Sequence, residues 1–520
     1  MKKNPWRFIE ETLNEKIKKN SFTNILQFAL TLPLVFIITP LILKFAGKEA
    51  YGIWAITGAI IIFLEYMSLQ TPAAVSVDVP KYNPKTEPEK INETMNTLFV
   101  FFLVLAAAAA AVFLLFRESL LAAFFRTEGA LLSEASFVLS FSVLAWLFNF
   151  VFVSFAYLTG GLNTFYPCNI LHIVTGYLRV ALMAAALFMG YGIKGIVAAQ
   201  MGTIILETFL IIAWMKIIFP PFAFNPLLFR LKRLERLIRL GVKLAVIRLA
   251  GSVSLNADKL ILGYFLNPVY AAYYQIGAGI SRYVSMLPDI IGSASLVPAA
   301  SELRQKKDTQ RVFGIFDRML KYILTGGVFI SAGIVFFGRE FIYLWLGEGY
   351  ETSYTVMAVL AAAYCAGLVI VPMQHVLNGL EKMNKLMIVA GSAAVLNIAL
   401  SVILASKYGI NGALAGTATA ITAGAIATWI LFKKETGHSL RYKELFVMPL
   451  ISAAAAYAPV FAFVKIMPGI EASWPALLMK VFLFSVLFVL FEVKVFRHID
   501  EYDTGVVRRF LKRENKTEYR

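Results

Sequence analysis

The sequence predicts an all-α integral membrane protein with fourteen transmembrane helices, arranged as two parallel six-helix repeats followed by two C-terminal helices. Three observations support this fold class. Of the 520 residues, 59% are hydrophobic and only 16% are charged, which excludes an ordinary soluble protein. The apolar residues come in blocks of about 20, the length that a helix needs to cross a bilayer. Finally, segments of the first half of the chain recur in the second half.

Each apolar block is predicted to form one membrane-spanning helix. A transmembrane β-barrel would need alternating segments of about ten residues, which the sequence does not show. In chain order, the predicted spans are 22–44, 50–79, 92–116, 131–159, 164–189, 193–219, 237–265, 268–300, 311–337, 350–378, 384–406, 409–432, 445–466 and 474–496.

The distribution of positive charge predicts the orientation of these helices. Most of the 49 Lys and Arg residues fall in the segments that share one face of the membrane with the N-terminus. By the positive-inside rule, both termini are therefore expected in the cytoplasm. The net charge of +17 then reflects topology, and no nucleic-acid partner is expected.

The internal repeat is clearest between 'PLILKFAGKEAYGIWAITG' (40–58) and 'KLILGYFLNPVYAAYYQIG' (259–277). At a nearly constant spacing, 'YGIKG' from Tyr191 also recurs as 'YGING' from Tyr408. Because each copy holds an even number of helices, both copies enter the membrane in the same direction. A transport pathway is expected between such parallel repeats.

The repeat divides the chain into four predicted regions. The second region, together with the start of the third, carries 'PLLFRLKRLERLIRLG' (226–241), whose alternating apolar and basic residues are typical of a helix on an anionic membrane surface. We favour a linker that sets topology over one that grips a substrate. The regions are an N-terminal six-helix lobe (1–219), a cytoplasmic amphipathic linker (220–236), a C-terminal six-helix lobe (237–434), and two extra transmembrane helices with a basic cytoplasmic tail (435–520).

Charged residues inside the spans are the candidate functional residues, because each costs about 3 kcal/mol or more in hydrocarbon. Arg179 and Glu207 lie at matched depth on helices joined by a hairpin, which predicts an ion pair, either structural or in contact with substrate. Glu65 and Arg282 lie at nearly equivalent depths of the two repeats. A pair between them would be either a gate between the halves or a static bridge.

The span at 237–265 adds Arg248, Asp258 and Lys259 as candidates. Arg248 and Lys259 are about three helical turns apart and so lie on one face, where snorkelling and cavity lining are both open. His172 shares a face with Arg179, which favours a hydrogen-bonded interior histidine. The predicted substrate-binding residues are Arg179, Arg248, Lys259 and Arg282, and the predicted coupling or gating residues are Glu65, Glu207 and Asp258.

Several motifs are absent from the sequence. It contains no G-x-x-x-x-G-K-[ST] phosphate loop and no H-E-x-x-H or clustered His and Cys, so no nucleotide, metal or other cofactor is expected. The short outer loops argue against a polytopic glycan ligase or polymerase, and the chain is not expected to be an enzyme. A cation-coupled exporter of small amphiphiles is the second alternative, although the intramembrane Arg and Lys residues argue against its acidic, aromatic cavity.

The segments 'NADKLILGYFLNPVYAAYYQIGAGI' (256–280), 'GKEAYGIWAI' (47–56) and 'LVPAASEL' (296–303) resemble polysaccharide flippases of the Wzx-like O-antigen translocase type. These flippases belong to the multidrug, oligosaccharidyl-lipid and polysaccharide exporter superfamily. Glu65 approximately fills the place of their acidic residue in span two, and Arg282 resembles the span-eight arginine of the related lipid II flippases.

The resemblance implies a function in polysaccharide biosynthesis, in a bacterial or archaeal inner membrane. The expected substrate is an undecaprenyl-pyrophosphate-linked oligosaccharide, such as an O-antigen unit, moved to the outer leaflet by alternating access. Spans one, two, seven and eight would line the central cavity, and polysaccharide polymerase and assembly proteins would be partners alongside the lipid bilayer. A lipid II flippase is the alternative within the superfamily, and coupling to H⁺ or Na⁺ stays open.

Overall fold

The computed structural model describes residues 13–125, 127–291, 296, 309–441, 443–466 and 472–495. These residues are helical almost throughout, and no β-strand occurs among them. The segment at 296–303 that carries part of the family resemblance lies outside the described residues except for Leu296, as does the basic tail from 496.

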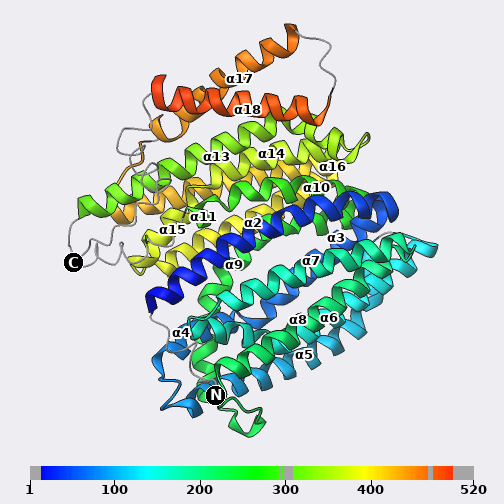
Figure 1. Cartoon of the computed structure of the whole chain (residues 1–520), viewed down its shortest axis with the longest axis vertical. Helices are drawn as coiled ribbons and strands as arrows, with labels where there is room; N and C mark the ends of the chain where they lie inside the picture. Colours follow the sequence, from blue (N-terminus) through cyan, green and yellow to red (C-terminus); the bar gives the residue numbers. More distant parts are fainter. Residues whose placement is uncertain are drawn as a thin grey trace, which may run out of the picture. The chain divides into compact units, whose positions relative to one another are not determined.

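The chain divides into two compact units. The first is Met1–Ile276 with Met383–Ala420, and the second is Gly277–Lys382 with Ile421–Arg520. The helices, of which the α-helices are labelled in Figure 1, are α2 (Leu13–Phe45), α3 (Gly47–Glu65), η1 (Tyr66–Ser68), α4 (Thr71–Asp78), η2 (Val79–Lys81), α5 (Pro88–Phe124), α6 (Gly129–Gly161), α7 (Tyr166–Phe188), α8 (Gly192–Ile218), η3 (Pro226–Leu228), α9 (Leu231–Phe265), α10 (Pro268–Ser285), α11 (Leu287–Ile290), α13 (Thr309–Leu346), α14 (Glu351–Gly367), α15 (Ile370–Gly379), α16 (Met383–Thr436), η5 (Lys443–Val447), α17 (Met448–Ile466), α18 (Trp474–Leu490) and η6 (Phe491–Val495).

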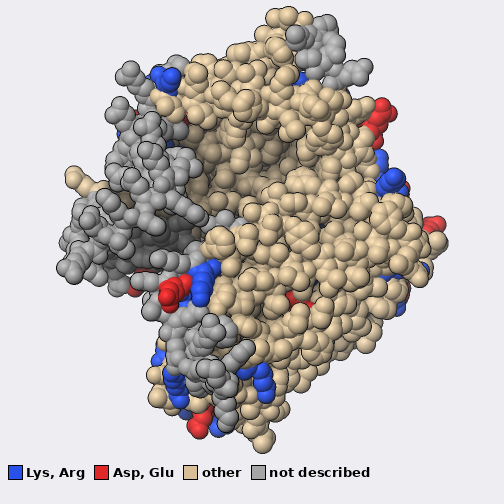
Figure 2. Space-filling model, in the orientation of Figure 1, with Lys and Arg blue, Asp and Glu red and all other residues tan. Residues whose placement is uncertain are grey.

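The prediction of an all-helical membrane protein is confirmed. Within the described residues, 11 helices are long and apolar enough to cross a membrane. One of them, α16, contains two predicted spans separated at Gly409, whose φ of 58° interrupts the helix. The polar helices α9 and α10 are not among the 11, so the count of fourteen and the repeat layout stay predictions. Figure 2 shows that charged side chains on the face drawn lie mainly near its edges.

The second predicted span is not one continuous helix, as the apolar pattern suggested. It is interrupted between α3 and α4, where Leu69 and Gln70 adopt left-handed backbone with φ of 50° and 52°. Pro72 favours a new helix start here, because proline fits the first turn of a helix but not its interior. The Thr71 hydroxyl donates to the Ser68 carbonyl at 2.8 Å, which satisfies a backbone group freed by the break.

Close helix packing in the first unit depends on glycine. A side chain at Gly52 in α3 would meet the backbone oxygen of Pro268 at 1.8 Å. A side chain at Gly263 near the end of α9 would meet the Phe124 oxygen at 2.7 Å and Ile56 at 2.8 Å. These glycines let backbones approach more closely than any larger residue allows, as is common between membrane helices. The end of α9 is thereby packed directly against α3 and α5.

In the second unit, the last two membrane helices pack on α13. Phe336 of α13 stacks on Tyr457 of α17 with ring centroids 3.9 Å apart. Lys480 of α18 donates to both carboxylate oxygens of Glu340 in α13, at 2.9 and 2.8 Å. Lys480 is a charge inside a predicted span, and this ion pair gives it a partner.

The Gly52 contact predicts a sharp difference between two glycines of the same helix. Gly52→Ala should lower the thermal unfolding midpoint of the purified protein, since the new methyl overlaps backbone and overpacking costs about 1–3 kcal/mol. Gly58→Ala is the control, because no heavy atom lies within 4 Å of the added carbon. Equal midpoints for the two variants would contradict the close approach of α3 to Pro268.

Candidate functional site

A polar network joins α7 and α8 around the Glu207 carboxylate. One oxygen, Oε2, accepts from Arg179 Nη2 at 2.9 Å and from the Thr175 hydroxyl at 2.8 Å. The other, Oε1, lies 2.5 Å from His172 Nδ1. Arg179 also donates through Nε to Thr203 at 3.0 Å. The ion pair suggested by the sequence is thus present, while a role of Arg179 or Glu207 in binding or coupling stays a prediction.

A second polar group surrounds Asp258, which is 1% exposed. Its Oδ2 accepts from the Tyr274 hydroxyl and from Thr417 at 2.5 Å. Thr417 in turn accepts from the Asn397 amide at 2.9 Å and lies 3.3 Å from the Ser401 hydroxyl. We call Asp258, Tyr274, Asn397, Ser401 and Thr417 the Asp258 cluster. Asp258 Oδ1 and Asn397 Oδ1 are buried and make no hydrogen bond.

The sequence reasoning found Asp258 but missed the three polar residues of α16. Asn397 and Ser401 are four residues apart, so they lie on one face of an otherwise apolar helix. Thr417 lies beyond the break at Gly409, in the part of α16 that returns alongside the first part. The four-residue spacing of polar groups was the available signal, but two polar residues four apart are a weak signal on their own.

Lys259 and Arg248 differ although they were predicted to share a helix face. The Lys259 ammonium is buried and donates to Asn256 Oδ1 at 2.8 Å and to Gln275 Oε1 at 2.9 Å, so the snorkelling interpretation does not describe it. Arg248 is exposed and donates to Gln70 Oε1 at 3.1 Å. Within the described residues Arg248 makes no ion pair. The predicted substrate-binding roles of both residues are untested by these contacts.

Arg282 and Glu65 are both exposed, at the end of α10 and the end of α3. Neither side chain makes a hydrogen bond or an ion pair with any residue in the described part of the chain. Arg282 belongs to the second unit and Glu65 to the first, so a bridge between them stays a prediction.

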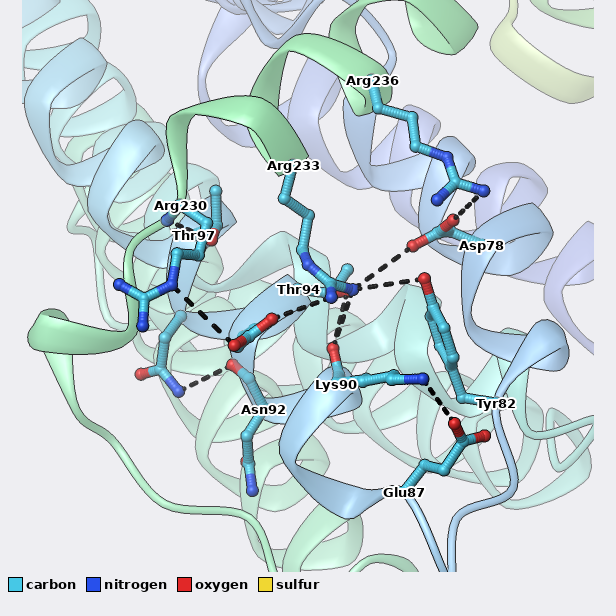
Figure 3. A network of polar contacts seen from close by, with 12 residues as sticks. Asp78, Tyr82, Glu87, Lys90, Asn92, Thr94, Thr97, Arg230, Arg233 and Arg236 are labelled. Atoms are coloured by element: carbon cyan, nitrogen blue, oxygen red, sulfur yellow. Dashed lines mark hydrogen bonds and ion pairs between the residues drawn. The ribbon is translucent and has the colours of Figure 1, made fainter.

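The start of α9 carries the largest group of ion pairs, drawn in Figure 3. Arg233 pairs with Glu93 at 2.8 Å and with the buried Asp78 at 3.8 Å. It also donates to Thr94 at 2.7 Å and to the Tyr82 hydroxyl at 3.4 Å. The basic residues of the predicted linker therefore contact α4, η2 and α5.

The backbone that precedes α9 is held by hydrogen bonds from two side-chain amides of α5. Asn92 donates to the Pro221 carbonyl at 2.9 Å, and Asn96 donates to the Ala223 carbonyl at 2.8 Å. The segment 226–241 is not a separate surface helix, because residues 231–241 are the start of α9. Beside this network, the Lys90 ammonium and the Asn83 backbone N–H hold the pKa of Glu87 below its ordinary value.

The chain is similar to a known family and to solved structures. A family model described as "Polysaccharide biosynthesis protein" matches residues 17–304. No curated protein matches the chain. A lipid II flippase MurJ in the inward closed conformation has a TM-score of 0.73 and 16% sequence identity, over 92% of this chain and 99% of that one.

Transporters of a second kind share the fold as well. An inward-facing multidrug resistance MATE family transporter of the MOP superfamily has a TM-score of 0.61 and 12% identity, over 79% of this chain and 98% of its own. A MOP superfamily transporter from Pyrococcus furiosus has a TM-score of 0.54 and 11% identity, over 84% and 99%. At such low identity the likeness shows the fold alone.

The Glu207 network predicts a stability effect. Glu207→Gln should lower the thermal unfolding midpoint, because it leaves the Arg179 guanidinium without its counter-ion at a cost of about 1–3 kcal/mol. Glu118→Gln is the control, since Glu118 pairs with Arg117 but is 83% exposed. If both variants unfold at the wild-type temperature, the Arg179–Glu207 pair is not structural.

Proposed function

The chain belongs to the polysaccharide biosynthesis protein family, and on that premise we propose that it is a flippase for a polyprenyl-pyrophosphate-linked oligosaccharide. The family match covers more than half of the chain and confirms the resemblance seen in the sequence. The fold is that of membrane transporters and flippases. An O-antigen or other surface polysaccharide unit is the substrate that we propose, moved from the cytoplasmic to the outer leaflet by alternating access.

The observation that supports this substrate most directly is the exposure of Arg248 and Arg282. Both are exposed arginines within or beside apolar segments, and neither has a carboxylate partner among the described residues. Such a charge is costly in a membrane unless it faces water or a ligand. A guanidinium fork matches phosphate oxygens in two parallel hydrogen bonds, so a pyrophosphate is a suitable ligand. Arg179 and Lys259 already bind other side chains of this chain, so we propose a secondary role for them in substrate binding.

The physical chemistry of the substrate requires a protein pathway but no ATP. Each sugar hydroxyl moved unpaired into hydrocarbon costs several kcal/mol, so the head group needs a wet route while the lipid tail stays in the bilayer. An inside-negative potential of about 100 mV favours outward movement of an anion by about 2.3 kcal/mol per charge. We accordingly propose a transporter without catalytic residues.

We propose further that the Asp258 cluster binds a coupling cation. Its oxygens are hard ligands with one formal negative charge, which suits Na⁺ or a proton better than a divalent ion. The unpaired Asp258 Oδ1 and Asn397 Oδ1 are buried acceptors, which are costly without a donor or a cation. Binding there would draw α9, α10 and α16 together, since these three helices supply the oxygens of the cluster.

A lipid II flippase is the second candidate function. The observation that favours it is the TM-score of 0.73 with the lipid II flippase MurJ. The arginines would bind the pyrophosphate of either lipid, so the sugar decides between the two functions.

Flipping by the reconstituted chain tests the proposal. Wild-type protein in liposomes should move a fluorescent polyprenyl-pyrophosphate oligosaccharide between leaflets, measured as the fraction accessible to an impermeant quencher. Arg248→Ala and Arg282→Ala should each slow this about tenfold or more, because a hydrogen bond to a charged group contributes about 1.5–3 kcal/mol. Arg239→Ala, an exposed arginine of α9 that pairs with Glu235, is the matched control and should flip at the wild-type rate.

The outcomes of this assay separate the candidates. Flipping no faster than in protein-free liposomes would refute the flippase function. Normal flipping by both arginine variants would remove these residues from the binding of the head group. Faster movement of lipid II than of the oligosaccharide would favour the second candidate.

The cation proposal predicts a Na⁺-specific stabilisation. Replacing K⁺ by Na⁺ should raise the unfolding midpoint of the wild type. Bound Na⁺ adds about 2.7 kcal/mol to the free energy of unfolding when its concentration is about a hundred times the dissociation constant. Asp258→Asn and Thr417→Ala should abolish this shift, whereas Thr428→Ala, a buried threonine of the same helix, should retain it. An undiminished Na⁺ shift in Asp258→Asn would rule out Na⁺ binding at this cluster.

A further inference from the structure

The first unit contains a cavity that the proposed function does not use. It lies between α3, α6 and α8 and has a volume of about 250 Å³, far more than the roughly 10–15 Å³ that a single water needs. Gly58, Glu65 and Asn149 are exposed along it, so it is open on one side. The space is large enough for a small organic molecule.

The described residues that line the cavity carry a single kind of charge. Glu65 is the one ionisable residue among them, and they include no Lys or Arg. The Glu65 carboxylate has no hydrogen bond or ion pair with the described residues around it. A carboxylate without a counter-ion beside apolar walls attracts cations and repels anions. A pyrophosphate head group is therefore disfavoured here, which sets this cavity apart from the arginines of the proposed function.

Two tryptophans give part of the cavity an aromatic wall. Trp54 and Trp146 both line the cavity, and Trp54 is held in place by a hydrogen bond from its Nε1 to Gln200 Oε1 at 3.2 Å. Aromatic rings that pack against one another gain about 0.5–1.5 kcal/mol beyond the area that they bury. The indoles thus favour a ligand with an aromatic body, while Glu65 favours a positive charge at its other end.

The polar atoms of the wall indicate a second feature of the ligand. Trp146 Nε1 and Thr57 Oγ1 are buried and have no hydrogen-bond partner, although both residues line the cavity. Buried donors are almost always paired in folded proteins, so unpaired donors beside a cavity indicate a missing acceptor. A ligand that brings a carbonyl or ether oxygen would satisfy them.

The remaining wall is apolar. Ile61, Ile62 and Ile204 form part of it, and Met201 adds an adaptable side chain. Trp54 and Glu65 are about three helical turns apart on α3, so the polar end and the aromatic end are separated by roughly 16 Å. The cavity therefore suits an amphiphile with a charged end and an apolar body.

We propose that this cavity binds a small lipophilic organic cation that carries a hydrogen-bond acceptor. This is a second ligand class for the chain, beyond the lipid-linked oligosaccharide. A neutral sugar would also use the indoles and amides, but it leaves the Glu65 charge uncompensated and gains little from the isoleucine wall. The positive charge of the ligand is thus the decisive property.

The test compares two probes of equal shape on the purified full-length protein. Benzoylcholine has a quaternary ammonium, an ester and an apolar ring, and 3,3-dimethylbutyl benzoate replaces its nitrogen by carbon. Wild-type protein should bind the cation at least about tenfold more tightly than the neutral isostere, as measured by calorimetry. Equal affinities, or no saturable binding of either probe, would overturn the proposal.

Variants locate the site. Glu65→Gln should bring the affinity ratio of the two probes to about one, and Trp54→Leu should weaken both probes severalfold. Glu118→Gln, which removes an exposed carboxylate outside the cavity, should keep the wild-type ratio. A wild-type ratio in Glu65→Gln would refute the site, as would methyl β-glucoside binding more tightly than benzoylcholine. Binding by Arg282→Ala should be unchanged, so this result does not depend on the flippase function.

Discussion

The cost of placing a charge among apolar helices is the constraint on which the rest of this structure depends. Most such charges have an ion-pair or hydrogen-bond partner inside the protein. Glu207 is bound by Arg179, and Lys480 is bound by Glu340. Asp258 is bound by neutral hydroxyls, which hold it in place without cancelling its charge. Each solution ties one helix to another, so the same groups that would weaken an isolated span strengthen the bundle.

The exceptions to this pairing define the functional proposals. Arg248 and Arg282 expose positive charge, while Glu65 exposes negative charge in a cavity whose described lining residues include no lysine or arginine. Groups of opposite sign favour different ligands. An anionic lipid head and an organic cation could be bound by the same chain, and each would leave the other site's electrostatic preference intact.

The sequence predicted the helical segments and the Arg179–Glu207 ion pair, because apolar composition is a local property and these two residues lie on helices joined by a hairpin. An apolar block and a charge within it can be recognised without knowledge of the partner helix. The sequence did not predict the features that depend on how the helices bend and pack. The break at Leu69 and Gln70 was hidden by the apolar run around it, and Asn397 and Thr417 become neighbours only because α16 turns at Gly409. Trp146 and Gln200 line one cavity through packing of helices that are distant in sequence.

That break in the second span in turn shapes the candidate site. It places Gln70 where its side-chain oxygen accepts from Arg248, and it lets the Tyr66 hydroxyl donate to the Arg248 carbonyl at 2.9 Å. The helix that carries Arg248 and Asp258 is also fixed at both ends, by Arg233 at its start and by the close packing of Gly263 near its end. A helix fixed in this way presents its side chains with little loss of entropy on binding. A neutral amide orients Arg248 without neutralising it, which leaves the full positive charge available to an anionic ligand.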